Sequence, residues 1–282
     1  MPIDYEHLMS LRTRGERVQY TDRDILLYAL GVGLGRNPDH RNELTYVTNP
    51  AGLRTLPTFA STLVGNRLLD DCGWNVARVF PRDESVSVER PMEDAGTLLL
   101  DSDVAAVLDK GAAGGALITV ETRARREGDA QPVFTVRRTW LAGGDGGFGG
   151  PQGNGPSGGG HAGSQLIPDR RPDMTRLCET RTDQALLFRL SAGQKAGRPV
   201  AMTPVLDGLC VQGIACLAIL REICEYDHTL IRAFSCRFAG PAYPGETLLA
   251  ELWQDANVVS CRLRAPGRDA LVLDLGRCVL AA

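Results

Sequence analysis

Short runs of alternating hydrophobic and polar residues fill most of the chain, and two longer runs are apolar on nearly every side. The long runs, residues 22–34 and 208–223, admit Gly and Ala at intervals and predict helices that are buried on most sides. The alternating runs are rich in Val, Leu and Thr, which predicts strands. These predicted strands are residues 85–89, 97–107, 115–123, 133–141, 233–238, 247–254, 258–263 and 270–280.

The order of one apolar helix followed by several strands occurs twice, and two segments match across the two halves. RPMEDAGTLLLDSDV (90–104) and GPAYPGETLLAELWQ (240–254) share a proline, a spacer, glycine, threonine, two leucines and an acid. An internal duplication explains both observations. The predicted fold is therefore α+β, with two hotdog units in one chain, each an antiparallel sheet curled around a largely buried helix.

A glycine-rich stretch separates the two halves. GGDGGFGGPQGNGPSGGGHAG (143–163) is more than half glycine, so it cannot hold a helix or a sheet by itself. We therefore predict an N-terminal unit at 1–142, a Gly/Pro-rich linker at 143–172 and a C-terminal unit at 173–282. Phe148 is a candidate anchor that packs on one of the units, whereas His161 lies in a segment too flexible to preorganise a proton donor.

Composition and charge exclude several classes of protein. The chain is 43% hydrophobic and carries a net charge of −3, so it can bury a core and lacks the basic footprint of a nucleic-acid binder. Its most apolar stretch, 208–220, is too short to span a bilayer, and its N-terminus has acids where a signal peptide has bases. Eight cysteines without a CxxC pair indicate packed, reduced thiols. We expect a soluble, cytoplasmic protein.

Nine segments, in order and spacing, resemble one family nearly from end to end: the MaoC-like, type 2 enoyl-CoA hydratases, which include the hydratase part of peroxisomal multifunctional enzyme type 2. The segments are YTDRDILLYALGVG (20–33), LPTFA (56–60), LDKG (108–111), GGFGG (146–150), PD (172–173), QALLFRLS (184–191), GLC (208–210), RFAGPAYPGET (237–247) and WQDANVV (253–259).

The resemblance implies hydration of trans-2-enoyl-CoA to (R)-3-hydroxyacyl-CoA, or the reverse dehydration. Water must lose a proton as it attacks C3, C2 must gain one, and the thioester oxygen needs hydrogen-bond donors for its developing charge. The family supplies an Asp and a His from a G-D-x-N-P-x-H motif directly after RLS. The glycine that opens the buried helix supplies one oxyanion donor. The resemblance implies neither a metal nor a cofactor.

This sequence departs from the family at the catalytic motif. After RLS it continues AGQKAGRPVAM, so the aspartate, asparagine and histidine of the motif are absent. Asp207 stands where the family has a histidine before the helix-opening glycine. Two further family histidines are replaced, at residues 80–84 and at Glu89. The four histidines that the chain does contain match no catalytic position of the family: His7, His40, His161 and His228.

The residues that match the family belong to its binding apparatus. Gly208 matches the oxyanion glycine, although it could also be only the start of a helix. Lys110 matches a substrate-binding lysine suited to a CoA phosphate, or it is a solvated surface lysine. Phe238 matches a substrate contact, or it is an ordinary core aromatic. Asp207 is either a substitute base or the N-cap of the buried helix.

Two hypotheses about function follow. The first is a hydratase or dehydratase of this family that acts on acyl thioesters with weak or altered chemistry, since loss of an essential acid or base costs ~10²–10⁴-fold each. The second is a non-catalytic acyl-CoA-binding protein or an inactive subunit of a larger assembly. Either way, the expected ligand is acyl-CoA or another acyl thioester, with no nucleic acid and no membrane as partner. Unshielded sheet edges make a homodimer plausible.

Overall fold

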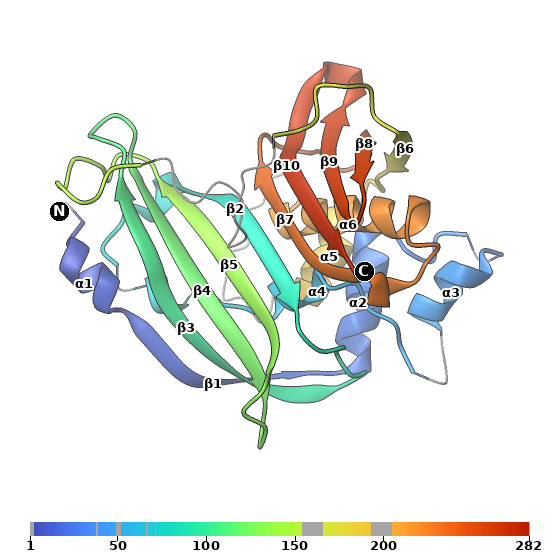
Figure 1. Cartoon of the computed structure of the whole chain (residues 1–282), viewed down its shortest axis with the longest axis horizontal. Coiled ribbons are helices and arrows are strands. Elements are labelled where there is room, and N and C mark those ends of the chain that lie inside the picture. The colour runs from blue at the N-terminus through green and yellow to red at the C-terminus, as the bar shows by residue number, and fades with distance from the viewer. Residues whose placement is uncertain are drawn as a thin grey trace.

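One antiparallel sheet of ten strands runs through both halves of the molecule (Figure 1). The computed structural model describes residues 3–37, 39–48, 52–65, 67–70, 72–153, 166–192 and 205–281. The strand order is β1-β3-β4-β5-β2-β7-β10-β9-β8-β6. The strands are β1 (Arg12–Tyr20), β2 (Val79–Val88), β3 (Gly96–Asp109), β4 (Ala116–Arg126), β5 (Pro132–Ala142), β6 (Met174–Glu179), β7 (Ile231–Phe238), β8 (Thr247–Asp255), β9 (Val258–Ala265) and β10 (Ala270–Leu280).

The sheet consists of two equivalent units of five strands. The N-terminal unit has the order β1-β3-β4-β5-β2, and the C-terminal unit has the same order, β6-β8-β9-β10-β7. The matched segments at 97–99 and 247–249 fall at the starts of β3 and β8, which occupy equivalent places. The units meet where β2 pairs with β7, with Ser85 opposite Ser235. The predicted duplication and the α+β fold with two hotdog units are therefore confirmed.

The helices lie on one side of this sheet, and the long buried one belongs to the C-terminal unit. α6 (Gly208–Glu222) contacts β6, β7, β8, β9 and β10, and every residue from Leu209 to Leu220 is buried. The predicted range, 208–223, begins at the same residue as α6 and ends one residue later. The other helices are α1 (Tyr5–Ser10), α2 (Asp22–Val32), α3 (Arg41–Val47), α4 (Phe59–Thr62) and α5 (Gln184–Ala192), with short 3₁₀ turns η1 (Arg67–Leu69), η2 (Val76–Arg78), η3 (His228–Leu230) and η4 (Pro266–Arg268).

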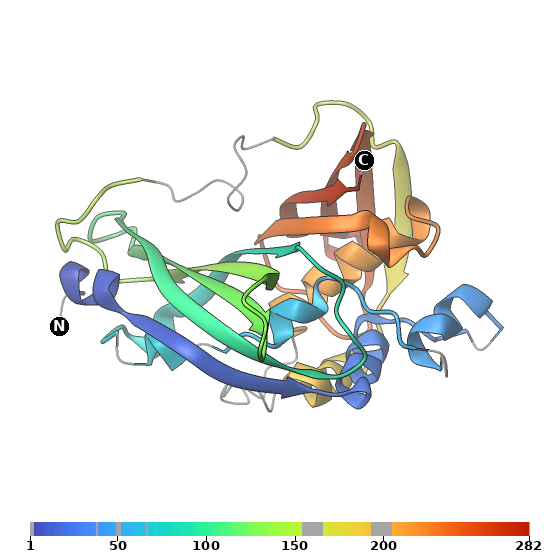
Figure 2. The same ribbon diagram turned by 60° about the horizontal axis from the view of Figure 1, so that its bottom comes forward.

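The N-terminal unit does not wrap around the helix that the sequence pattern suggests. Its counterpart of α6 is the single turn α4, which touches β2, β5 and α6. α2, predicted as that counterpart, instead packs along α5, and each of these two helices follows the first strand of its unit (Figure 2). A side chain at Gly31 would approach the Cα of Phe188 to 3.0 Å, which explains the glycine in α2. The prediction that the helices at 22–34 and 208–223 occupy equivalent places was wrong. An apolar pattern indicates that a helix is buried, but it does not indicate which element covers the helix.

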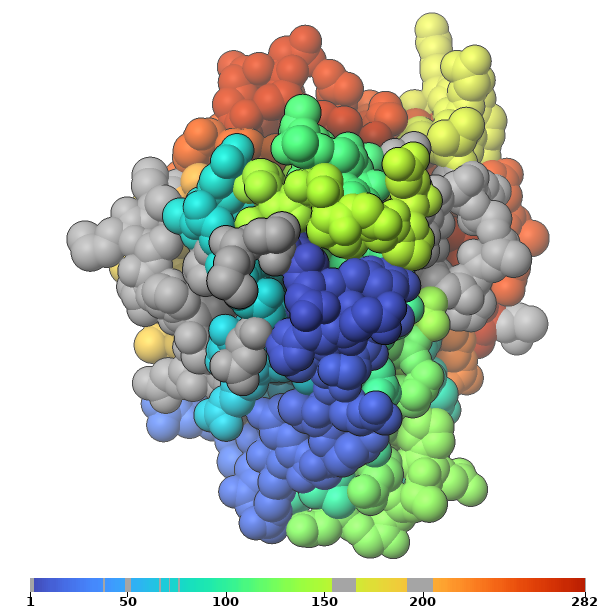
Figure 3. Space-filling view, turned by 90° about the vertical axis from the view of Figure 1, so that its left-hand side faces the viewer, coloured from blue at the N-terminus to red at the C-terminus, as the bar shows by residue number. Residues whose placement is uncertain are grey.

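The start of the predicted linker lies on the N-terminal unit. Phe148 stacks on Tyr5 with ring centroids 6.4 Å apart, and the Asp109 carboxylate accepts hydrogen bonds from the N–H groups of Gly147 (2.7 Å) and Gly149 (2.8 Å). Figure 3 shows the segment after β5 lying against the N-terminal helix. Phe148 is thus the anchor that was predicted. Residues 154–165, with His161, lie outside the described residues, and the unit boundaries stay a prediction.

The cysteine side chains are packed in the interior of the molecule. All eight cysteines are free and buried. Burial raises the pKa of Cys72 and of Cys224 to about 11, so both thiols stay protonated near neutral pH. Within the part of the chain that the structure describes, no helix combines the length and apolarity needed to cross a bilayer.

The contacts of Asp109 predict a pH-dependent anchor. Hydrogen bonds from the N–H groups of Gly147, Gly111 and Gly149 lower the pKa of Asp109. Because the folded pKa is depressed, the stabilisation is present above the unfolded value of about 4 and is lost as pH falls through the folded value. Asp109→Asn should speed hydrogen exchange at Gly147 and Gly149 at neutral pH. Asp103→Asn, on the same strand but paired with Arg14 at the surface, is the control. Equal protection in both variants would refute the anchor.

Candidate functional site

Three of the four sequence-predicted site residues come together at the N-terminus of α6. Asp207 precedes the helix in an extended conformation (φ −60°, ψ 144°), and its Oδ1 accepts a hydrogen bond of 2.8 Å from the N–H of Leu209. The preceding residue is fixed as well, since the N–H of Leu206 donates to the carbonyl of Ala242 at 2.8 Å. The capping interpretation of Asp207 is confirmed by this hydrogen bond.

Gly208 is the first residue of α6 and lies under the ring of Phe238. A Cβ atom at Gly208 would come within 3.1 Å of the Phe238 Cε1 and Cζ atoms, so any larger residue would displace the ring. Phe238 is the last residue of β7 and is only partly buried. The first N–H groups of a helix have no acceptor inside the helix, and the helix dipole makes this end electropositive. The site can therefore polarise a carbonyl oxygen without any side chain.

A buried glutamine lies one turn further along the same face of α6. Residues four apart on a helix are separated by about 40° around its axis, so Gln212 follows Gly208 on nearly the same line. Gln212 is fully buried, and neither its Nε2 nor its Oε1 has a hydrogen-bond partner among the described residues. A buried polar group left in this state costs about 1–3 kcal/mol. The sequence signal was available but was missed, because Gln212 is the one strongly polar residue between Leu209 and Leu220.

A buried ion pair lies beside the site on the N-terminal unit. The Arg138 guanidinium donates from Nε to Glu84 Oε2 at 2.6 Å and from Nη2 to Glu84 Oε1 at 2.9 Å. The two side chains are 6% and 0% exposed. Burial lowers the pKa of Arg138, but the charge and hydrogen bonds of Glu84 and the charge of Asp207 outweigh it, and the pKa is raised overall. The Arg138–Glu84 ion pair therefore lies within electrostatic reach of Asp207.

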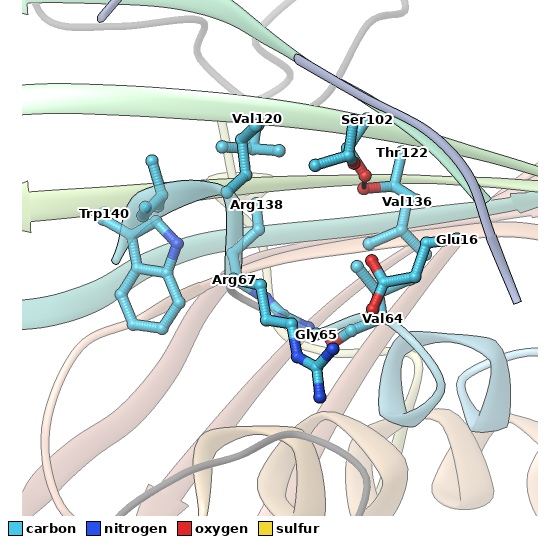
Figure 4. Close-up of a pocket in the computed structure, with 13 residues that line it drawn as sticks. Glu16, Val64, Gly65, Arg67, Ser102, Val120, Thr122, Val136, Arg138 and Trp140 are labelled. Atoms are coloured by element: carbon cyan, nitrogen blue, oxygen red, sulfur yellow. Dashed lines mark hydrogen bonds between the residues drawn. The ribbon is translucent and has the colours of Figure 1, made fainter. Parts of the chain in front are cut away.

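The Arg138 side chain also fills the interior of the N-terminal unit (Figure 4). The space around it encloses a volume of only about 10 Å³, which is room for about one water molecule. Its wall is polar as well as apolar, since Ser102 and Thr122 share a hydrogen bond of 2.8 Å there. No acyl chain fits into this space as the side chains lie.

Lys110 is not brought next to Gly208. It lies in the turn between β3 and β4, at the end of the N-terminal unit away from α6, and its backbone N–H donates to the carbonyl of Gly115 at 2.9 Å (Figure 1). Gly208, Asp207 and Phe238 thus form one cluster, and Lys110 belongs to a separate part of the surface.

No described histidine lies at this site, and no metal centre is formed. His40 Nε2 is 3.1 Å from the Tyr226 hydroxyl, His228 contacts the edge of Tyr46, and His7 is on α1. Residues 193–204, the segment in which we expect the family's catalytic motif to be replaced, lie outside the described residues. Among the residues that the structure does describe, no three His, Cys, Asp or Glu side chains gather in a way that could hold a metal ion.

Comparisons with known proteins agree with this geometry. Residues 18–144 match the family model described as MFE-2 hydratase 2 N-terminal domain. The chain is 32% identical to the enoyl-CoA hydratase ChsH3 of Mycobacterium tuberculosis, over 97% of each chain. It is 33% identical to the peroxisomal enoyl-CoA hydratase 2 of Arabidopsis thaliana, over 91% of this chain and 89% of the relative.

The fold of the chain also matches that of solved structures. A MaoC-like dehydratase from Phytophthora capsici superposes with a TM-score of 0.82 at 23% identity and covers 99% of both chains. With two relatives above 30% identity along most of its length, the chain belongs to the MaoC-like, type 2 enoyl-CoA hydratase family, a family of hydro-lyases.

Proposed function

We propose that the protein binds acyl-CoA or a related acyl thioester at the N-terminus of α6. The supporting observation is that Gly208 combines an electropositive helix end with the cover of the Phe238 ring. The thioester oxygen accepts a hydrogen bond from the helix N-terminus, and Phe238 packs against the atoms next to the thioester. Family membership supports the ligand class, since the two relatives compared above are named enoyl-CoA hydratases.

We further propose that hydration or dehydration by this protein is weak or altered. The chain lacks the motif's Asp and His, and the nearest carboxylate, Asp207, already caps α6. The Asp207 carboxylate is engaged by the N–H of Leu209, so it is less available to take a proton from water. The proton transfers that hydration needs therefore lack a strong base and a partner acid.

A non-catalytic acyl-thioester-binding role, or a role as an inactive subunit of a larger assembly, is the second candidate. The observation that favours it is the capping hydrogen bond of Asp207, because it gives this residue a structural function that needs no catalysis. Both candidates share the same binding site and differ only in turnover.

The site also suggests a further contact for the acyl group. Among the described residues, the amide Nε2 and Oε1 of Gln212 have no partner, and Gln212 lies one turn after Gly208 on nearly the same helix face. A ligand that brings a hydroxyl or carbonyl group to this amide would satisfy it. We therefore propose that Gln212 contacts the bound acyl group.

Hydration of crotonyl-CoA tests the proposed chemistry. We expect the protein to bind crotonyl-CoA and a longer enoyl-CoA in calorimetry but to hydrate them at least ~10²-fold more slowly than a family hydratase that carries the motif. Asp207→Asn keeps an N-cap oxygen and removes the base. It should preserve binding and abolish any residual turnover if Asp207 is that base. Turnover at the rate of the motif-bearing enzyme would overturn the proposal of weak chemistry, and absent binding would overturn the site.

Replacement of the buried amide tests the role of Gln212. Gln212→Met keeps the shape and removes both unpaired polar groups, so the free energy of unfolding in urea should rise by about 1–3 kcal/mol. Acyl-CoA binding should weaken in the same variant. Gln184→Met is the matched control, because Gln184 is equally buried but bonded to Arg36 and Gly31, and its loss should destabilise the protein. Unchanged affinity in Gln212→Met would remove Gln212 from the binding site.

Salt dependence tests Lys110. If its ammonium group meets a CoA phosphate, Lys110→Ala should weaken acyl-CoA binding, and the loss should shrink as ionic strength rises. Arg17→Ala removes an exposed surface cation from β1 and serves as the control. An affinity at low salt equal to that of the unmodified protein would exclude Lys110 from the binding site.

A further inference from the structure

The seam between the two units carries a row of polar residues on the face of the sheet away from α6. Side chains alternate between the faces of a strand, and Glu84, Val86, Phe234 and Cys236 point into the buried side. Ser85 and Ser235, between them, therefore point to the other side. They are paired directly where β2 meets β7.

An arginine flanks each of these serines. Ser85 is paired with Arg137 on β5, and Ser235 is paired with Arg277 on β10. The two arginines are related by the duplication, because β5 and β10 occupy the same place in their units. Their backbones are three strand spacings apart, or roughly 14 Å. All four residues line one groove of about 240 Å³, floored by small side chains that include Ser87 and Ala233.

The two units differ on the strands next to these arginines, β4 and β9. As a result, one arginine has a carboxylate opposite it and the other does not. Arg137 is opposite Glu121 on β4, and that nearly buried carboxylate forms ion pairs with both Arg137 and Arg123. The equivalent neighbour of Arg277 is Ser260 on β9. Within the described residues, Arg277 has no ion pair and no side-chain hydrogen bond. Three guanidinium groups and one carboxylate line the groove, and the Glu89 carboxylate at its edge accepts hydrogen bonds from Ser87 and Thr135. Among the described residues, these groups leave an excess of one positive charge.

We propose that this groove is a binding site for a phosphoryl group carried by a small molecule, separate from the acyl-thioester site. Arg277 and Arg137 close on the phosphate oxygens from the two sides, and the hydroxyls of Ser85 and Ser235 donate from the floor. The groove is smaller than the usual 300–1,000 Å³ of a site that engulfs a whole small-molecule ligand, so it holds the phosphoryl end and leaves the rest of the molecule outside.

Inorganic phosphate and adenosine 3′,5′-bisphosphate are the probes, titrated at low ionic strength and followed by calorimetry and by the NMR signal of the Arg277 guanidinium. Inorganic phosphate should bind saturably, and stronger binding of the bisphosphate would identify a nucleotide as the natural carrier. Arg277→Ala should weaken binding of phosphate by roughly 10–100-fold, the value of charge-assisted hydrogen bonds. Arg232→Ala removes an exposed cation of the same strand region outside the groove and should leave the affinity unchanged.

A second variant tests the broken symmetry itself. Ser260→Glu places a carboxylate beside Arg277, as Glu121 lies beside Arg137, and should abolish phosphate binding while both arginines remain. The proposal fails if phosphate does not bind saturably up to millimolar concentrations, or if Arg277→Ala binds as well as the unmodified protein. It also fails if phosphate binding is lost in Lys110→Ala instead, because the anion site would then be at the β3–β4 turn. Crotonyl-CoA binding should survive in Arg277→Ala, which separates this proposal from that for α6.

Discussion

The pairing of β2 with β7 is the contact on which the rest of the structure depends. It joins two units with open sheet edges into one sheet, so that backbone donors and acceptors at the seam are satisfied. Because side chains alternate along each strand, the same pairing directs Glu84 and Cys236 toward the helices and Ser85 and Ser235 to the outer face. The candidate thioester site and the arginine groove are two faces of this one seam.

Much of this arrangement could be predicted from the sequence, for identifiable physical reasons. Strands such as β3 and β8 follow from alternation and from the shared threonine and leucines at 97–99 and 247–249. The start of α6 follows from the Asp207–Gly208 pair, since a capping acid before an apolar run marks a helix N-terminus. These are local signals, and they require no knowledge of what lies across the core.

Apart from Gln212, the missed features depend on partners distant in sequence. α2 and α6 have similar apolar patterns, yet only α6 is enclosed by a sheet, and α2 pairs with α5 across the molecule. Arg138 looks like one of two surface arginines in a strand until Glu84, 54 residues earlier, is found beside it. The groove likewise needs the register of β2, β5, β7 and β10, which fixes Arg137 and Arg277 on the same face.

At the start of α6, hydrogen-bond donation depends on the backbone, whereas proton transfer depends on side chains. This difference explains how binding and catalysis can separate in this fold. The N–H at a helix N-terminus belongs to the backbone and persists as long as the helix and its Asp207 cap persist. Proton transfer depends on side chains, which substitution can remove without disturbing the fold. Here the Asp207 cap, Gly208 and the ring of Phe238 lie together at the start of α6. In the function proposed for this chain, the backbone at the start of α6 supplies the donor for the thioester oxygen, whereas turnover depends on side chains.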